Sequence, residues 1–149
     1  MGADPALYNF GPHPDLPGWL LWRVDDVDRF NHVLGDLAIQ CREDGRVLLR
    51  LQPQPRLSNL VGGMHGGALM TFIDVALFVG PMARGDKDAI GGATIDLSTQ
   101  FAGAVDLGRP LDLILEIVRE TGRLRFLRGT VEQGETMIAS FMGTVRKAR

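Results

Sequence analysis

The residues best suited to chemistry lie between positions 59 and 78, in the stretch NLVGGMHGGALMTFIDVALF. Asp74 is the only ionisable side chain in the apolar run from Ala68 to Val79. Because burying an unpartnered carboxylate is costly, this acid must be paired, protonated or functional. Asp74 is therefore a candidate functional residue, and a buried, hydrogen-bonded structural role is the alternative.

A cluster of glycines stands directly before the apolar run, at positions 62, 63, 66 and 67. Such a cluster predicts the entry to a helix, where the first backbone amides have no partner inside the helix and carry a partial positive charge. The amides near Gly66 and Gly67 could polarise a carbonyl oxygen and stabilise the oxyanion that follows nucleophilic attack. A tight turn without a chemical role is the alternative.

The spacing within this stretch limits how the residues can cooperate. Gly66 and Asp74 are separated by a helical rise of about 12 Å, which is too far for both to act on one carbonyl group from the same chain. If the two residues cooperate, the site is built from two chains. A similar rise excludes a dyad of His65 and Asp74 within one helix. His65 and Asn59 flank the glycines, and they either orient a substrate or brace the loop.

Strand signals surround the expected helix. Residues 37–43 and 46–51 flank Asp44-Gly45, a pair that favours a β-hairpin. After a glycine-containing loop at 83–92, four further strands are expected to follow one another as a meander, from about residue 94 to 101 and then at 111–121, 124–132 and 136–146. In the first of these four, simple alternation places Ile95, Leu97, Thr99 and Phe101 on one face and Thr94, Asp96, Ser98 and Gln100 on the other.

These elements predict one α+β domain in which a curved antiparallel sheet wraps around one long central helix. Residues 1–18, which contain four prolines, are expected to form an irregular N-terminal arm, and residues 19–149 the single domain. The net charge of −2 gives no footprint of a nucleic-acid binder. The apolar run is shorter than a membrane span, and the first residues do not resemble a signal peptide, so we expect a cytoplasmic protein without a membrane partner.

Several other chemistries lack their patterns. The single cysteine, Cys41, excludes an internal disulfide. The three histidines and this cysteine have no metal-ligand spacing, no GxxxxGK[ST] motif occurs, and no GxGxxG motif follows a strand. We therefore expect neither a metal ion nor a bound nucleotide cofactor.

The motif Asn59-x-x-Gly62-x-x-His65-Gly66-Gly67, with Asp74 seven residues later, resembles the signature of hotdog-fold acyl-CoA thioesterases of the phenylacetic-acid degradation (PaaI-like) type. The segments GGATIDLSTQFAGAV, ETGRL and MIASFMGTVRK resemble the strands of the same family. The resemblance covers residues 19–147 and leaves the N-terminal arm outside.

This resemblance implies a hotdog fold, homodimers with a continuous sheet that often pair into homotetramers, active sites at the dimer interface, and hydrolysis of acyl-CoA without a cofactor. It further implies that the Gly66 amide polarises the thioester carbonyl and that Asp74 of the partner chain acts as base or nucleophile. By the same resemblance Asn59 and His65 help to hold the thioester end or the attacking water, and Gly67 and Thr94 lie near the substrate.

Arginines near the Gly122 turn and the C-terminus suggest a contact with the phosphates of CoA, with Arg123 as the main candidate beside Arg125, Arg146 and Lys147. A solvated charged edge is the alternative for each of them. Two other functions stay open, a non-catalytic acyl-CoA-binding hotdog module and a hotdog dehydratase. The acyl group and the choice between dimer and tetramer also stay open.

Overall fold

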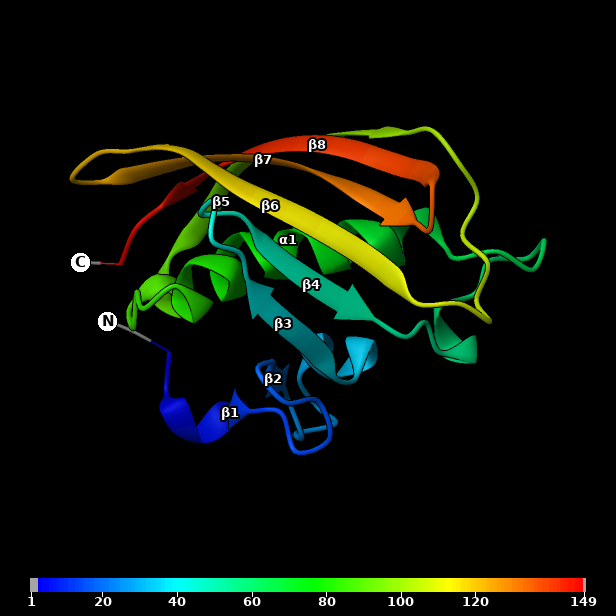
Figure 1. Ribbon diagram of the computed structural model, residues 1–149, viewed down its shortest axis with the longest axis horizontal. Helices are drawn as coiled ribbons and strands as arrows, with labels where there is room; N and C mark the ends of the chain where they lie inside the picture. The colour runs from blue at the N-terminus through cyan, green and yellow to red at the C-terminus, as the bar shows by residue number, and fades with distance from the viewer. Residues whose placement is uncertain (1–2, 149) are drawn as a thin grey trace.

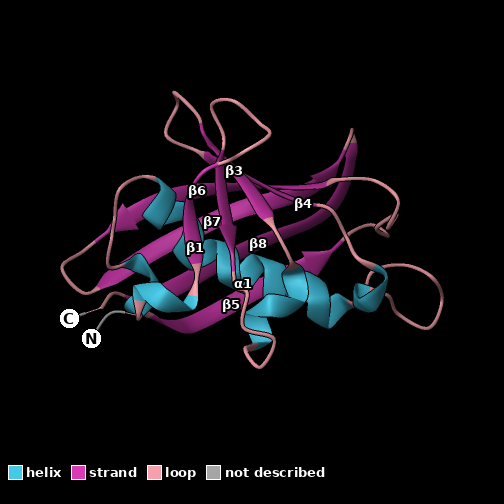
Figure 2. Ribbon diagram, turned by 90° about the horizontal axis from the view of Figure 1, so that it is seen from below, coloured by secondary structure: helices cyan, strands magenta, loops and turns pink. Residues whose placement is uncertain are grey.

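The computed structural model describes residues 3–148, and within them one α-helix lies in the hollow of an eight-stranded antiparallel sheet (Figure 1). The helix is α1 (Gly66–Ala83), and the strands follow the spatial order β1-β2-β3-β4-β6-β7-β8-β5. Figure 2 shows the helix against one face of the strands. This arrangement confirms the predicted α+β hotdog fold.

The strands are short before the helix and long after it. They are β1 (Asn9–Pro12), β2 (Leu20–Arg23), β3 (Leu37–Cys41), β4 (Val47–Leu51), β5 (Ala93–Phe101), β6 (Leu111–Glu120), β7 (Leu124–Gln133) and β8 (Thr136–Arg146). Four 3-10 turns lie outside the strands, with η1 (Pro5–Leu7) before β1 and the others in the connections, η2 (Phe30–Leu34), η3 (Pro55–Leu57) and η4 (Ala89–Gly91). The predicted hairpin at Asp44-Gly45 is confirmed, with Gly45 in the left-handed region at φ 91°.

The N-terminal arm is more regular than its prolines suggest. Strand β1 pairs with β2 from Asn9 opposite Arg23 to Pro12 opposite Leu20, so the expectation of an irregular segment over residues 1–18 is wrong for these positions. Proline is tolerated here because β1 is an edge strand, whose outer backbone groups need no sheet partner. Residues 1 and 2 of the arm lie outside the described residues.

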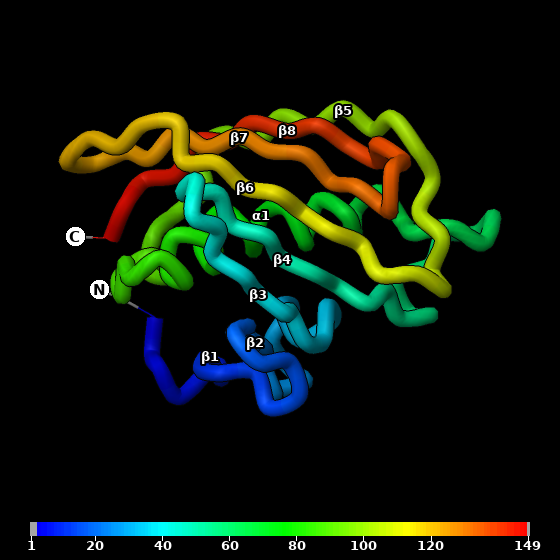
Figure 3. Tube along the Cα trace, viewed as in Figure 1, coloured from blue at the N-terminus to red at the C-terminus, as the bar shows by residue number. Residues whose placement is uncertain are grey.

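The four strands after the helix do not form a simple meander. Strands β6, β7 and β8 follow one another, but β5 pairs with β8 and lies at the edge of the sheet. Between β5 and β6 the chain crosses the end of the molecule, as the tube in Figure 3 shows, and β6 then pairs with β4. Hydrophobic alternation shows which side chains share a face but does not show which strands are neighbours, and for this reason the predicted order was wrong.

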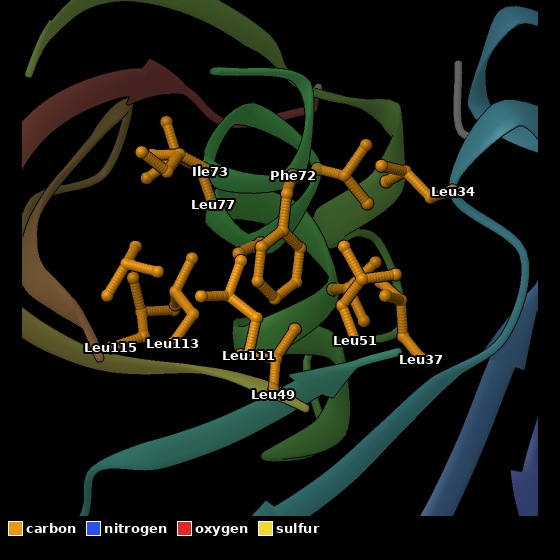
Figure 4. Close-up of a cluster of buried hydrophobic side chains, with 14 of the residues drawn as sticks. Leu34, Leu37, Leu49, Leu51, Phe72, Ile73, Leu77, Leu111, Leu113 and Leu115 are labelled. Atoms are coloured by element: carbon orange, nitrogen blue, oxygen red, sulfur yellow. The ribbon is translucent and has the colours of Figure 1, made fainter. Parts of the chain in front are cut away.

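The core lies between α1 and the concave face of the sheet. Phe72, Ile73 and Leu77 of the helix face leucines of the sheet and its connections, which Figure 4 labels at positions 34, 37, 49, 51, 111, 113 and 115. By length and composition α1 could cross a membrane, with a mean hydropathy of 1.6, but 61% of it is buried inside the fold. The apolar sequence of α1 is therefore accounted for by its place in the core.

Candidate functional site

Asp74 lies on the side of α1 that the sheet leaves uncovered. The half-buried or exposed positions Gly67, Met70, Thr71, Asp74 and Phe78 recur every three or four residues and so form one stripe along the helix. The fully buried residues of α1 occupy the other faces. The acid is thus half-buried at the border of the core, which explains how an otherwise apolar helix can carry it.

The side chain of Asp74 is held by β5. The Thr94 hydroxyl donates a hydrogen bond to Asp74 Oδ1 at 2.6 Å. Charge-assisted bonds of this kind are stronger than bonds between neutral groups and fix the carboxylate in orientation. The structure thus brings Thr94 and Asp74 together, and a place for Thr94 near a reacting centre stays a prediction.

A β-bulge makes this contact possible. Thr94 pairs with Val145 and Asp96 with Thr144, which leaves Ile95 as an extra residue in β5. Such a bulge turns the preceding side chain to the other face of the sheet. Thr94 therefore points toward the helix together with Leu97, Thr99 and Phe101, and its expected place on the face of Asp96 is wrong.

The start of α1 offers two free backbone donors. His65 is the N-cap, and its Nδ1 accepts the Gly67 amide at 2.9 Å, while the Leu69 amide bonds to the His65 carbonyl at 3.1 Å. Within residues 3–148 the amides of Gly66 and Ala68 have no acceptor. The Gly66 amide is thus the first of two N–H groups at this helix end that can still bind an oxygen.

The glycine at position 67 is explained by its neighbour. A Cβ atom there would lie 3.0 Å from His65 Nδ1 and 3.2 Å from Cε1, so a side chain would push the capping ring away. Because the Gly67 amide already donates to His65, a direct substrate contact by Gly67 stays a prediction. Because Nδ1 accepts a hydrogen bond, the ring hydrogen of the exposed His65 lies on Nε2.

Asn59 braces the loop before the helix. Its Oδ1 accepts the amides of Val61 at 2.9 Å and Gly63 at 3.0 Å, and its Nδ2 donates to the Met64 carbonyl at 3.3 Å. The backbone N–H of Asn59 also donates to the Gly63 carbonyl at 2.7 Å, and Gly62 has φ 89° in this turn. Of the two roles open to Asn59, these bonds support the bracing one.

A depression of about 430 Å³ opens beside Gly66. Its lining has no ionisable side chain and comes from the loop at Asn59, from Gly66 and Leu69 of the helix, and from the segment Phe101–Val105. Phe101 is 54% exposed, and its ring lies 3.8 Å from the position that a Cβ of Gly66 would take. This contact could not be predicted from the sequence, because Gly66 and Phe101 lie far apart in the chain.

The basic candidates lie at the other end of the molecule. The turn between β6 and β7, which holds the exposed Arg123, lies at the far left of Figure 1, and the loop before α1 at the far right. Arg125 is buried and paired with Asp86 and Glu120, so its charge is already compensated by two carboxylates. Partial burial acts to raise the pKa of Asp86, but the side-chain bond from Arg125, the backbone amide of Asp88 and the charges of Arg125 and Lys147 together hold that pKa below its ordinary value.

A sheet curled around one helix, with a glycine-led helix entry and a carboxylate on the open helix face, defines the class of hotdog thioesterases. The chain belongs to the thioesterase superfamily, whose sequence pattern matches residues 61–140, more than half of the chain. A search among curated proteins finds no match.

Solved structures share the fold. Thioesterase superfamily member 2 of zebrafish has 18% identity and a TM-score of 0.71, covering 83% of this chain and 89% of its own. A protein of Bacillus halodurans solved with CoA has 26% identity and a TM-score of 0.63, over 74% and 73% of the two chains. The phenylacetic acid degradation protein PaaI of Thermus thermophilus has 20% identity and a TM-score of 0.63, over 75% and 93%.

Proposed function

We propose that the protein hydrolyses an acyl-CoA thioester to CoA and a carboxylic acid, at two equivalent sites that each combine Gly66 of one chain with Asp74 of another. The observation that carries the proposal is the pair of groups on α1. A free amide stands at the start of the helix, and a carboxylate oriented by Thr94 stands eight residues later on its open face. The helical rise of about 12 Å between them requires two chains for one carbonyl group.

Two features support an association of two copies about a two-fold axis. The stripe of α1 that carries Asp74 is uncovered, and β5 is an edge strand that presents unpaired backbone groups. Antiparallel packing of two such helices brings each Asp74 toward the Gly66 of the partner subunit and forms two identical sites, as an isologous interface requires.

The chemistry follows from these groups. The thioester carbonyl oxygen accepts the Gly66 N–H, which stabilises the negative charge that develops on that oxygen. Asp74 takes a proton from a water molecule whose oxygen attacks the carbonyl carbon, or its own oxygen attacks to give an anhydride that water then cleaves. In both routes the C–S bond breaks and the sulfur leaves as a thiolate that takes up a proton. Thr94 keeps the carboxylate oriented throughout.

Subunit mixing tests the shared site. One variant carries Asp74→Asn, and the other carries Gly66→Val to block the carbonyl position. The methyl group of alanine at position 66 would meet only the Phe101 ring at 3.8 Å, so the backbone tolerates a side chain there. Each variant alone is expected to be inactive. A mixed dimer has one site with both defects and one with neither, so activity should return toward half of wild type per heterodimer. Verified heterodimers as inactive as their parents would rule out the shared site.

CoA recognition is a second part of the proposal. The Bacillus halodurans relative was solved with CoA, which supports a CoA ester as the substrate class. We propose that the exposed Arg123 contacts the nucleotide phosphates, because guanidinium groups bind phosphate in a bidentate manner. Arg123→Gln is then expected to raise KM for acyl-CoA several-fold and to leave KM for a truncated pantetheine thioester unchanged. An equal effect on both substrates would exclude a contact with the nucleotide.

A further inference from the structure

A second, smaller pocket lies where the N-terminal arm meets the rest of the molecule. Its volume is about 220 Å³, and Leu7, Tyr8, Trp22, Phe30 and Ile90 are among the residues that line it; we call it the arm pocket. The arm and β2 lie at the bottom of Figure 1, whereas the loop before α1 lies at the far right. None of the described residues that line the arm pocket also lines the depression at the helix entry, so the two are separate.

An aromatic pair in the arm pocket contains an unpaired hydrogen-bond donor. The rings of Tyr8 and Trp22 are stacked, with their centroids 6.4 Å apart and their planes inclined by 29°. Trp22 is 2% exposed, and within residues 3–148 its indole Nε1–H has no acceptor. Because buried donors in folded proteins nearly always have a partner, this N–H group favours a ligand that brings an oxygen atom into the pocket.

The charge of the arm pocket comes from Arg29. Among the described residues of its lining, Arg29 is the only one with a charged side chain. Its ion pair with Asp26 is long, at 3.4 Å between Arg29 Nε and Asp26 Oδ2, and longer than a usual hydrogen bond between these atom types. A guanidinium group held so loosely can bind a second carboxylate. One cation and one buried N–H group, without an acid beside them, suit a ligand with a single anionic group.

Phe30 lines the same pocket and is 73% exposed to solvent. Burial of an aromatic ring is favourable, so a ring left in solvent beside an apolar pocket marks a place where an apolar ligand can bind. A ligand body that lies against Phe30 and Trp22 would remove apolar surface from water on both sides. The ligand that this pocket fits is therefore apolar except for its anionic group.

We propose that the arm pocket binds a small carboxylic acid with an apolar body, whose carboxylate contacts Arg29 and whose body lies against Trp22 and Phe30. A cavity of about 150 Å³ is large enough for benzene, so the arm pocket has room for one ring or a short hydrocarbon chain next to a carboxylate. Hydrolysis of an acyl-CoA ester releases an acid of this class. The identity of the ligand as the reaction product rests on the proposed function, whereas the binding of such an acid does not.

The fluorescence of Trp22 measures this binding directly. The chain has two tryptophans, so Trp19→Phe leaves Trp22 as the only emitter. The probes are octanoate and benzoate, with octanol and benzyl alcohol as their uncharged counterparts. Each acid is expected to change the Trp22 emission saturably, to bind more tightly than its alcohol, and to shift the single indole N–H signal in NMR spectra.

Two substitutions separate the contact with the carboxylate from the contact with the apolar body. Arg29→Gln should weaken the binding of the acids at least ten-fold and leave that of the alcohols unchanged. Arg46→Gln is the matched control, because Arg46 is also an exposed arginine paired with a nearby aspartate, Asp44, and does not line the pocket. Phe30→Ala should weaken acids and alcohols alike. Val27→Ala should weaken neither, because Val27 is similarly exposed, at 74%, but does not line the pocket.

Several outcomes would overturn the proposal. Equal affinity for acids and alcohols, or acid binding that Arg29→Gln leaves unchanged, would exclude the carboxylate contact. Trp22 emission and an indole signal that stay constant at millimolar acid would exclude the site. Gly66→Val should leave the affinity unchanged, and loss of acid binding in that variant would place the acid at the helix entry instead. None of these measurements needs turnover, so a protein that binds the acids without hydrolysing any thioester would contradict the proposed function alone.

Discussion

Asp74 shows how one polar side chain can be accommodated on an apolar helix. Its position on the uncovered stripe keeps the carboxylate partly exposed, and the Thr94 hydroxyl donates a hydrogen bond to one of its oxygens at 2.6 Å. The remaining oxygen is left for a substrate or a water molecule. The uncovered position and the Thr94 hydroxyl, which make the acid tolerable, therefore also make it available for chemistry.

Replacement of this acid tests its role. Asp74→Asn is expected to lower turnover by at least about 100-fold, which is typical for loss of a general base, because the amide neither accepts the proton of water nor attacks carbon. The fold should survive, since Asn is nearly isosteric. Release of free thiol from acyl-CoA measures turnover. Asp96→Asn, the same change on the other face of β5, serves as the control and should keep its activity. A folded Asp74→Asn variant with wild-type turnover would remove Asp74 from the mechanism.

Thr94 is expected to act through Asp74 and not on the substrate. Thr94→Val keeps the shape and loses the hydrogen bond, a loss of about 1.5–3 kcal/mol for a bond to a charged group. If the lost hydrogen-bond energy served to hold the Asp74 carboxylate in its reactive orientation, kcat drops about ten- to 100-fold while KM changes little. Thr94→Ser should restore most of kcat because it restores the donor. A Ser variant as slow as the Val variant would argue against positioning by the hydroxyl.

At the scale of elements, the loop after α1 is tied to the sheet by one buried cation. Arg125 on β7 bonds to Asp86 in that loop and to Glu120 at the end of β6. The arginine side chain is 3% exposed, so its charge depends on these two carboxylates for compensation. This contact fixes the path by which the chain enters β5, and hence the position of Thr94.

The lowered pKa of Asp86 predicts a pH dependence of stability. A carboxyl whose pKa is lower in the folded than in the unfolded state stabilises the fold above its ordinary pKa, and this contribution disappears as the pH falls through the folded value. Asp86→Asn should lower the free energy of unfolding by about 1–2 kcal/mol at pH 7, and the difference from wild type should shrink below about pH 4. Urea unfolding at both pH values measures this. Asp88→Asn, an exposed neighbour, is the control. A difference that is constant with pH would contradict the linkage.

The sequence predicts the elements better than their relations. Apolar alternation and the Asp-Gly turn identify β3, β4, β6, β7 and β8, and the apolar run identifies α1, because these signals are local. The edge position of β5 and the direction of the Thr94 side chain could not be predicted, because both depend on how β5 pairs with β8. A single bulged residue, Ile95, moves Thr94 to the face opposite to the expected one. Strand β1 was not predicted because its four residues lie among prolines.

The residues of the candidate site also fall into those that the sequence predicts and those that it does not. Gly66, His65 and Asp74 are found from their types and spacing within one stretch of sequence. The contact between Phe101 and Gly66 and the pairing of Arg125 with Asp86 are not, since both arise only when distant strands meet. The bracing role of Asn59 was one of two possibilities, and its three side-chain bonds favour it.

At the scale of the whole molecule, a site shared between copies makes activity depend on association. The specific activity per chain is expected to be constant at high protein concentration and to fall on dilution below the dissociation constant of the dimer, because a lone chain holds Gly66 and Asp74 about 12 Å apart. Sedimentation at the assay concentrations shows which species is present. Full specific activity in a monomeric sample would contradict this expectation.

The two ends of the sheet differ in a way that limits assembly. Strand β5 presents nine residues to a partner, whereas β1 at the opposite edge has four and ends in Pro12, which has no amide hydrogen to donate. Short, proline-bearing edge strands resist the addition of further strands. If the long edges of two copies join, as proposed, only the short β1 edges remain exposed. Such a pair is then expected to resist the addition of further copies and not to grow into a fibre.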